Sequence, residues 1–265
     1  MTGKKIRQNR FFYKGTKVGL VVPMDHGLTI GPVEGIESPE RIASFIGSPA
    51  LTGVILHKGM IERLQDSLGH SGVMLHVNGM SNISSNPDKK EQIATIETAV
   101  RLGADGISLQ VNFDGLNDDH NLKMLGSVVD DAQRFGLPVL TMLYDKVNVG
   151  DKQITRLRHL MRIAVELGTD ALKLAAPEKL ELLPEILNGF TAHTNIFFAG
   201  GSLSSEAQML QLATAVVEAG ASGLCIGRNV FQRENPNVIL AAIQNRLLDA
   251  SVQRQPLRMS QYASH

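Results

Sequence analysis

Short apolar runs alternate along the chain with longer segments in which apolar residues recur every three or four positions. The second pattern is typical of amphipathic helices, as where Ile93, Ile96 and Val100 share one face. The runs are apolar almost throughout, as parallel strands covered on both faces are. We predict eight strands, at residues 17–25, 52–57, 72–78, 105–112, 138–144, 170–175, 195–201 and 222–228.

Three similar segments, residues 99–112, 164–177 and 215–228, each join the end of a helix to a strand through a glycine. Helix, glycine and strand in repetition indicate βα units. The chain has 265 residues, close to the roughly 250 that are typical of a (β/α)8 barrel. We therefore predict an α/β fold, a single-domain (β/α)8 TIM barrel, in preference to a doubly wound open sheet. The expected divisions are an N-terminal covering segment (1–16), the barrel (17–250) and a polar, flexible tail (251–265).

Composition narrows the classes of function. The 26 basic and 26 acidic side chains balance, which argues against nucleic acid or an anionic membrane surface as a partner. The one cysteine, Cys225, excludes a disulfide framework. No apolar run reaches the roughly 18 residues of a membrane span, and the N-terminus lacks the pattern of a signal peptide. We expect a soluble, cytoplasmic protein.

Polar residues gather where the predicted strands end. In a barrel of this kind these ends meet at one opening, where catalytic residues lie. For any one residue a loop or capping role is equally reasonable, but the whole set predicts an active site. The set comprises Asp25, His26, His57, Lys58, His76, Asn78, Gln110, Asn112, Tyr144, Asp145, Lys146, Lys173, Gly200, Gly201, Gly227 and Arg228.

Lys173 interrupts an otherwise apolar strand. If Leu172 and Leu174 face the helices, strand alternation points Lys173 into the barrel. Burial there is expected to lower the pKa of the lysine and leave a neutral amine, which can form a Schiff base with a ketone or aldehyde. The alternatives are a lysine that reaches solvent from the strand end, and Lys58 as the nucleophile instead. Lys146 follows its strand in a polar loop and is a weaker candidate.

Two further residues supply the proton transfers that an aldolase needs. Tyr144 ends the strand before that of Lys173 and is a candidate general acid and base. Asp25 ends the first strand and can orient substrate hydroxyls or move protons, although it can equally cap the loop that follows.

The last two strands end in glycines, in "AGGS" and "CIGRN". Small residues at a strand-to-helix turn let backbone N–H groups approach an anion, and this place is the usual phosphate site of the fold. Gly200, Gly201 and Gly227, with the Arg228 guanidinium, therefore predict a phosphorylated substrate.

Several motifs together resemble a known family: "VVPMDHGLTIGPVEGI" (21–36), "LHKG" (56–59), "SSNPDKK" (84–90), the lysine strand, "AGG" (199–201) and "GASGLCIGRNVFQRENP" (220–236). The chain resembles the archaeal-type class I aldolases of the DhnA/DeoC/LacD group, and within it the 2-amino-3,7-dideoxy-D-threo-hept-6-ulosonate synthases. The resemblance runs from about residue 5 to about residue 245.

The resemblance implies a TIM barrel, often in ring-shaped decamers, that needs no metal or cofactor. It implies a Schiff base at Lys173, a proton donor at Tyr144, substrate contacts from Asp25 and the four residues after it, and a phosphate site at the two glycine turns. Those four residues are His26, Gly27, Leu28 and Thr29. Asp145 and Lys146 are also candidate substrate contacts.

The substrates that the resemblance implies are a phosphorylated ketose or dihydroxyacetone phosphate and an aldehyde, L-aspartate 4-semialdehyde. Relatives that cleave fructose 1,6-bisphosphate, or that act as thiolases on a phosphorylated diketone, are the alternatives. Two stretches depart from the family pattern: "YDKV" replaces Tyr-Pro-Arg-Gly, and "LAAP" follows the lysine in place of a Thr-x-Tyr-Thr-like stretch. Both lie beside the catalytic residues and make a specialised donor or acceptor, as in the related aminohydroxybenzoate-precursor synthases, a further candidate.

Two other kinds of function are compatible with the sequence. His26, His57 and His76 end successive strands and are suitable ligands for a catalytic Zn²⁺, so a metal-dependent aldolase is one alternative. The other is an inactive relative that binds a phosphorylated metabolite without turnover.

Overall fold

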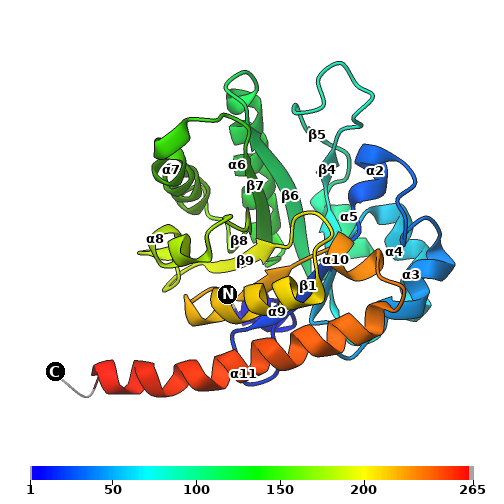
Figure 1. Cartoon of the computed structure of the whole chain (residues 1–265). Helices are drawn as coiled ribbons and strands as arrows, with labels where there is room; N and C mark the ends of the chain where they lie inside the picture. Colours follow the sequence, from blue (N-terminus) through cyan, green and yellow to red (C-terminus); the bar gives the residue numbers. More distant parts are fainter. Residues whose placement is uncertain (1, 263–265) are drawn as a thin grey trace.

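The computed structural model of the chain describes residues 2–262 and shows one closed barrel of parallel strands (Figure 1). The order around the ring is β1-β10-β9-β8-β7-β6-β3-β2, so the first and last strands close it. The fold is the predicted (β/α)8 barrel, and not an open sheet. Its strands are β1 (Gly19–Pro23), β2 (Gly53–Leu56), β3 (Gly72–His76), β6 (Gly106–Phe113), β7 (Val139–Asp145), β8 (Ala171–Ala175), β9 (Asn195–Ala199) and β10 (Gly223–Cys225).

Helices surround the strands, and several begin where a side chain caps them: Ser38, Thr95 and Ser205 each accept a hydrogen bond from a backbone N–H three residues on. The longer helices are α1 (Thr2–Asn9), α3 (Pro39–Ile46), α4 (Lys58–Leu64), α5 (Ile96–Arg101), α6 (Asp118–Arg134), α7 (Gln153–Glu166), α9 (Glu206–Glu218) and α11 (Pro236–Tyr262). The short ones are α2 (His26–Ile30), α8 (Leu183–Leu187), α10 (Arg228–Phe231), η1 (Gln65–Ser67), η2 (Gly150–Lys152) and η3 (Leu180–Leu182).

Helix α11 packs along α9 and continues past the barrel (Figure 1). It reaches Tyr262, so residues 251–262 of the segment predicted as a polar, flexible tail are helical. Residues 263–265 of that predicted tail lie outside the described part of the chain. Polar residues such as Gln253 and Arg254 are good helix formers, which explains why the helix does not end where its apolar pattern does.

Apolar side chains form two separate cores. One lies between the strands and the helices and includes Leu172 and Leu174. The other fills the inside of the barrel and includes Met142, Phe197 and Cys225. Alternation along each strand assigns its residues to one core or the other, and it decides which side chains reach the barrel interior.

The N-terminal segment covers the lower end of the barrel, where the strands begin. Phe11 is buried there, and a Cβ on Gly53 or Gly72 would come within 2.6 Å or 2.8 Å of its ring. The hydroxyl of Tyr13 donates to the carbonyl of Ala50 at 2.7 Å. Glycines at the starts of two strands therefore make room for an aromatic plug, and the opposite end remains as the mouth of the barrel.

A two-stranded hairpin, β4 (Asn78–Gly79) with β5 (Glu91–Gln92), follows β3 and was not predicted from the sequence. The loop between its strands projects beside α2 at the mouth (Figure 1). The backbone N–H of Asn82 donates to the carbonyl of Thr29 at 2.8 Å and ties the loop to that helix.

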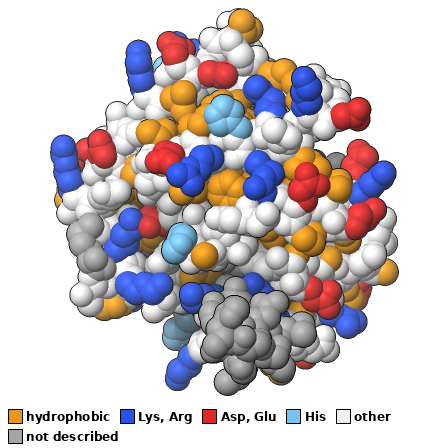
Figure 2. Space-filling view, turned by 90° about the vertical axis from the view of Figure 1, so that its left-hand side faces the viewer, with side chains coloured by type: hydrophobic (Ala, Val, Ile, Leu, Met, Phe, Trp, Pro, Cys, Tyr) orange, Lys and Arg blue, Asp and Glu red, His pale blue; other side chains and the backbone are white. Residues whose placement is uncertain are grey.

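The face shown in Figure 2 carries basic and acidic side chains mixed with apolar ones, and neither sign forms a broad patch there. Within residues 2–262, none of the helices combines the length and apolar character that crossing a bilayer requires.

Candidate active site

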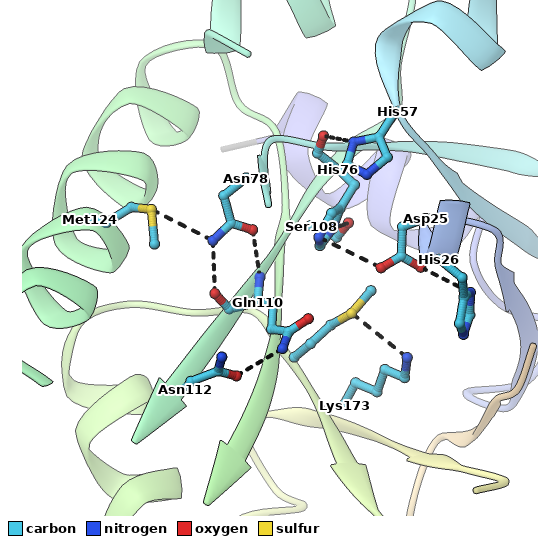
Figure 3. A network of polar contacts seen from close by, with 11 residues as sticks. Asp25, His26, His57, His76, Asn78, Ser108, Gln110, Asn112, Met124 and Lys173 are labelled. Atoms are coloured by element: carbon cyan, nitrogen blue, oxygen red, sulfur yellow. Dashed lines mark hydrogen bonds and ion pairs between the residues drawn. The ribbon is translucent and has the colours of Figure 1, made fainter. Parts of the chain in front are cut away.

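Lys173 lies in the middle of β8 with its side chain inside the barrel, as strand alternation predicts. It pairs in register with Met142 of β7 and Phe197 of β9, and it is 6% exposed. Its Nζ lies 3.7 Å from Sδ of Met142 (Figure 3). Ala175, two residues further along the same face of β8, is exposed, so the amine lies just below the open mouth.

The prediction that the pKa of Lys173 is lowered is wrong. Burial does lower this pKa, but Tyr144, Cys225 and Asp25 raise it, and a hydrogen bond with Tyr144 adds to their effect. The net pKa of Lys173 lies above the ordinary value, so the resting side chain is an ammonium ion. A proton must therefore leave Lys173 before the amine can attack a carbonyl, and Asp25, the carboxylate that interacts with Lys173, is the base that can receive it.

Asp25 follows β1 and points across the mouth toward Lys173 (Figure 3). Its Oδ2 lies 3.7 Å from Nε2 of His76, and its Oδ1 lies 3.8 Å from Nδ1 of His26. Burial raises the pKa of Asp25, but His76, His26 and Lys173 lower it, and the net pKa lies below the ordinary range. Asp25 is thus a carboxylate. The pKa values of His26 and His76 are lowered, so Lys173 is the neighbour that remains positively charged at neutral pH.

Two buried polar atoms in this group, Oδ1 of Asp25 and Nδ1 of His26, have no hydrogen-bond partner among the described residues. Leaving such atoms unpaired costs free energy, so they are expected to bond to substrate or water. Both belong to the segment that follows β1.

His57 and His76 form a second pair of rings, 5.2 Å apart and edge to face. Nδ1 of His57 contacts the carbonyl of His76 at 3.2 Å, and Nδ1 of His76 contacts Oγ of Ser108 at 2.8 Å. Although His26 is also nearby, no three histidine, cysteine or acidic side chains of residues 2–262 converge as metal ligands. This geometry does not favour the zinc site considered from the sequence.

The glycine turns after β9 and β10 are held by Asn229, which is fully buried. Its Nδ2 donates to the carbonyls of Gly200 (3.0 Å) and Ser202 (2.8 Å), and its Oδ1 accepts from the N–H of Ser204 at 2.9 Å. Asn229 therefore fixes the whole turn that follows β9. The sequence analysis missed this residue, although "GRN" places it directly after the predicted phosphate residues.

Gly227 precedes α10 and packs against the site. A Cβ there would lie 2.8 Å from Cε1 of His26 and 2.9 Å from the ring of Phe231. The guanidinium of Arg228 has no hydrogen bond or ion pair to any residue that the structure describes, and it acts electrostatically on His26. The turn is thus open, positively charged and close to the Asp25 group.

The arrangement of Lys173, Tyr144, Asp25 and the glycine turns coincides with a family-level match. A model of the DeoC/LacD family aldolases matches residues 20–233. The chain belongs to this aldolase family. It is a class I aldolase, an enzyme that works through a lysine Schiff base.

Known proteins resemble this aldolase over most of their length. The 2-amino-3,7-dideoxy-D-threo-hept-6-ulosonate synthase of Halobacterium salinarum is 31% identical over 91% of this chain and 90% of its own. The 2-amino-4,5-dihydroxy-6-oxo-7-(phosphonooxy)heptanoate synthase of Streptomyces griseus is 24% identical over 89% and 87%. A solved Schiff-base-forming fructose-1,6-bisphosphate aldolase has a TM-score of 0.81 at 24% identity, covering 92% of this chain and 99% of its own.

The structure does not bring all the predicted residues of the aldolase together. Lys58, the rival nucleophile, is exposed and donates to the carbonyl of Ile93 at 2.9 Å, outside the barrel. Asp145 accepts from Nε of Arg156 at 2.9 Å and from Nε2 of Gln153 at 2.8 Å, so its carboxylate is bonded to α7 rather than aimed at substrate. These contacts give Asp145 a structural role.

The segment Gly27–Thr29 forms the α2 turn above the mouth of the aldolase. Leu28 is 37% exposed, and its Cδ2 occupies the space that a Cβ on Gly79 would need. Gly27 is exposed as well, and Thr29 is half-buried. The residues predicted to contact substrate after Asp25 therefore lie at the rim, and His26 alone among them reaches the Asp25 carboxylate.

Acid pH is expected to destabilise the aldolase through His76. Burial lowers the pKa of His76 to about 3, against an ordinary value of 6.5, and Asp25 opposes this only in part. Between these values the unfolded chain holds a proton that the folded protein lacks, so the free energy of unfolding falls as pH falls. His76 alone should contribute a loss of about 2 kcal/mol between pH 6.5 and pH 5.

Denaturant unfolding of the wild type and His76→Gln at several pH values in that range measures this contribution. The variant should lose about 2 kcal/mol less than the wild type. Equal losses in the two proteins would show that His76 does not titrate in this way.

Proposed function

We propose that the protein is a Schiff-base aldolase or transaldolase that joins a fragment of a phosphorylated ketose, or dihydroxyacetone phosphate, to L-aspartate 4-semialdehyde. The observation that carries the proposal is the buried amine of Lys173, which shares the barrel interior with Tyr144 and Asp25. The relatives support the choice of substrate, since both synthase names describe a seven-carbon 2-amino acid and one includes a phosphonooxy group.

The reaction begins when Lys173 gives up its proton and its Nζ attacks the ketone carbon of the donor. Loss of water from the carbinolamine leaves an iminium ion, which draws electrons from the neighbouring carbon. Removal of a proton, or cleavage of a C–C bond, at that carbon gives an enamine. The enamine carbon then attacks the aldehyde carbon of the acceptor, and hydrolysis of the new iminium ion frees Lys173.

Tyr144 and Asp25 supply the proton transfers in this sequence. The Asp25 carboxylate can take the proton of the ammonium ion and pass it to the substrate, and the Tyr144 hydroxyl, hydrogen-bonded to Lys173, can donate a proton to the hydroxyl that leaves as water. The Asp25 carboxylate, with its unpaired Oδ1, is suited to accept a hydrogen bond from a substrate hydroxyl. Its negative charge also stabilises the iminium ion that forms beside it.

The glycine turns are the proposed phosphate site. Asn229 holds the first turn with its backbone fixed, and Arg228 presents a guanidinium without a protein partner in the described residues. Gly201 has a φ of 68°, a backbone conformation that glycine adopts without strain. A phosphate bound here would place the ketone of a three-carbon donor toward β8, two strands around the ring from β10.

Trapping with borohydride tests the proposal. The protein is incubated with dihydroxyacetone phosphate or with unphosphorylated dihydroxyacetone, reduced, and mapped by mass spectrometry. We expect an adduct on Lys173 that forms far more readily with the phosphorylated ketone. Addition of aspartate semialdehyde before reduction should yield an amino-acid product, and glyceraldehyde 3-phosphate serves as the competing acceptor. Failure of every phosphorylated ketose to give an adduct would overturn the mechanism.

A further inference from the structure

Lys90 is a buried lysine that the proposed mechanism does not use. It lies immediately before β5, in the hairpin that the sequence did not predict, and it is 3% exposed. Its ammonium group has no hydrogen bond or ion pair to any described residue. Nζ of Lys90 is nevertheless not among the buried atoms left unpaired, so the side chain is buried while the ammonium group itself stays open to a ligand.

The charge of Lys90 acts at the mouth of the barrel. Asp25 contributes to raising the pKa of Lys90, and Lys90 in turn contributes to lowering the pKa of His76. Burial has the largest effect and lowers the pKa of Lys90 overall, with Asp88 opposing it. An anion bound beside the ammonium would compensate for that burial.

Three contacts hold the hairpin loop around Lys90 in place. The Lys90 carbonyl contacts Nε2 of His120 on α6 at 2.8 Å. Nδ2 of Asn112 at the end of β6 donates to Oδ1 of Asp88 at 2.9 Å, and Nδ2 of Asn86 donates to Oδ1 of Asn117 at 3.0 Å. The hairpin thus fixes Lys90 over the ends of β3 and β6, so its charge is positioned before any ligand arrives.

The ring order sets the distance between the two charged regions. From β10, which carries Arg228, four steps in either direction lead to β6, so the two strands lie on opposite sides of the barrel. Lys173 on β8 lies midway between them. A substrate held by a phosphate at the glycine turns and extending past Lys173 would direct its far end toward Lys90.

We infer that Lys90 binds the carboxylate of the acceptor aldehyde and so selects an acidic acceptor. This inference rests on the proposed function, because it names the part of the same site that the second substrate occupies. A carboxylate is favoured over a second phosphate because Asp88 and Asp25 act on Lys90, and the other nearby ammonium, that of Lys146, is paired with Asp88. Asp88 is itself occupied by Lys146, at 3.2 Å, and by Asn112.

The test compares acceptors in Lys90→Met. With dihydroxyacetone phosphate as donor, kcat/KM is measured for aspartate semialdehyde, for neutral propionaldehyde and for glyceraldehyde 3-phosphate. Loss of a charge-assisted hydrogen bond should lower kcat/KM for aspartate semialdehyde about 10- to 100-fold. The change with propionaldehyde should stay below about threefold. Lys89→Met is the matched control, because Lys89 is half-exposed and pairs with Glu91 at the surface.

Lys90→Arg keeps the positive charge and should recover part of the activity with the acidic acceptor. This variant shows whether the loss in Lys90→Met comes from the missing charge or from misfolding. Equal losses with the acidic and neutral acceptors, or no loss with either, would overturn the inference. A loss confined to glyceraldehyde 3-phosphate would overturn the carboxylate assignment. Borohydride trapping of the donor in Lys90→Met separates the two proposals: an adduct on Lys173 leaves the proposed function standing even where the role of Lys90 fails.

Discussion

Replacing Lys173 with methionine is expected to lower turnover by about 10⁴-fold or more and to abolish the borohydride adduct. The amine is the group that forms the covalent intermediate, and no other described lysine lies inside the barrel beside Tyr144 and Asp25. Methionine is similar in length and apolar, and it would contact Met142 and Phe197, so the fold should persist. Steady-state kinetics and mass spectrometry of the reduced protein measure the two effects.

Lys58→Met is the control for this experiment. Lys58 begins α4 directly after β2, and its exposed amine donates to the carbonyl of Ile93 outside the barrel. We expect full adduct formation in that variant and turnover within about twofold of the wild type, as for an exposed surface position. An adduct that survives in Lys173→Met but disappears in Lys58→Met would move the active site to Lys58.

Replacing Tyr144 with phenylalanine is expected to lower kcat by about 10²- to 10⁴-fold with a small change in KM. The ring would occupy the same half-buried place at the end of β7, while the hydroxyl that donates a proton during loss of water from the Lys173 carbinolamine would be lost. The adduct should still form, but slowly, because the amine is present and only its proton transfer is impaired. Rapid-quench trapping with borohydride measures the rate of that step.

Tyr13→Phe offers a matched change at the other end of the barrel. The Tyr13 hydroxyl is buried and donates to the carbonyl of Ala50 at 2.7 Å, far from the mouth. Its loss should cost about 1 kcal/mol of stability and leave kcat unchanged. If Tyr144→Phe also retains kcat within about fivefold, then Asp25 or water carries the proton instead.

The sequence predicts the barrel because local pattern and fold agree. Each strand is covered on both faces, so it is apolar almost throughout. Such a run can be recognised from its own residues, without knowing which segments pack against it. Alternation within the strand also predicts that Lys173 faces inward while Leu172 and Leu174 face the helices. These features depend on residues that are adjacent in sequence.

Features that depend on distant segments could not be predicted in the same way. The direction of the pKa shift of Lys173 was wrong because Tyr144 and Asp25 come from β7 and the end of β1. Lys90 appears in a polar stretch whose hairpin is only two residues deep on each side, too short for a strand pattern. Asn229 donates hydrogen bonds to backbone carbonyl groups after β9. A sequence pattern describes side chains only, so it does not indicate such contacts.

The pairing of β1 with β10 has a consequence for synthesis of the protein. Gly19 and Gly223 lie side by side, so one edge of the first strand stays without its partner until almost the whole chain has left the ribosome. Contacts between such distant residues slow folding and leave strand edges open to other chains. Growing chains of this enzyme should therefore depend on chaperones more than its finished form does.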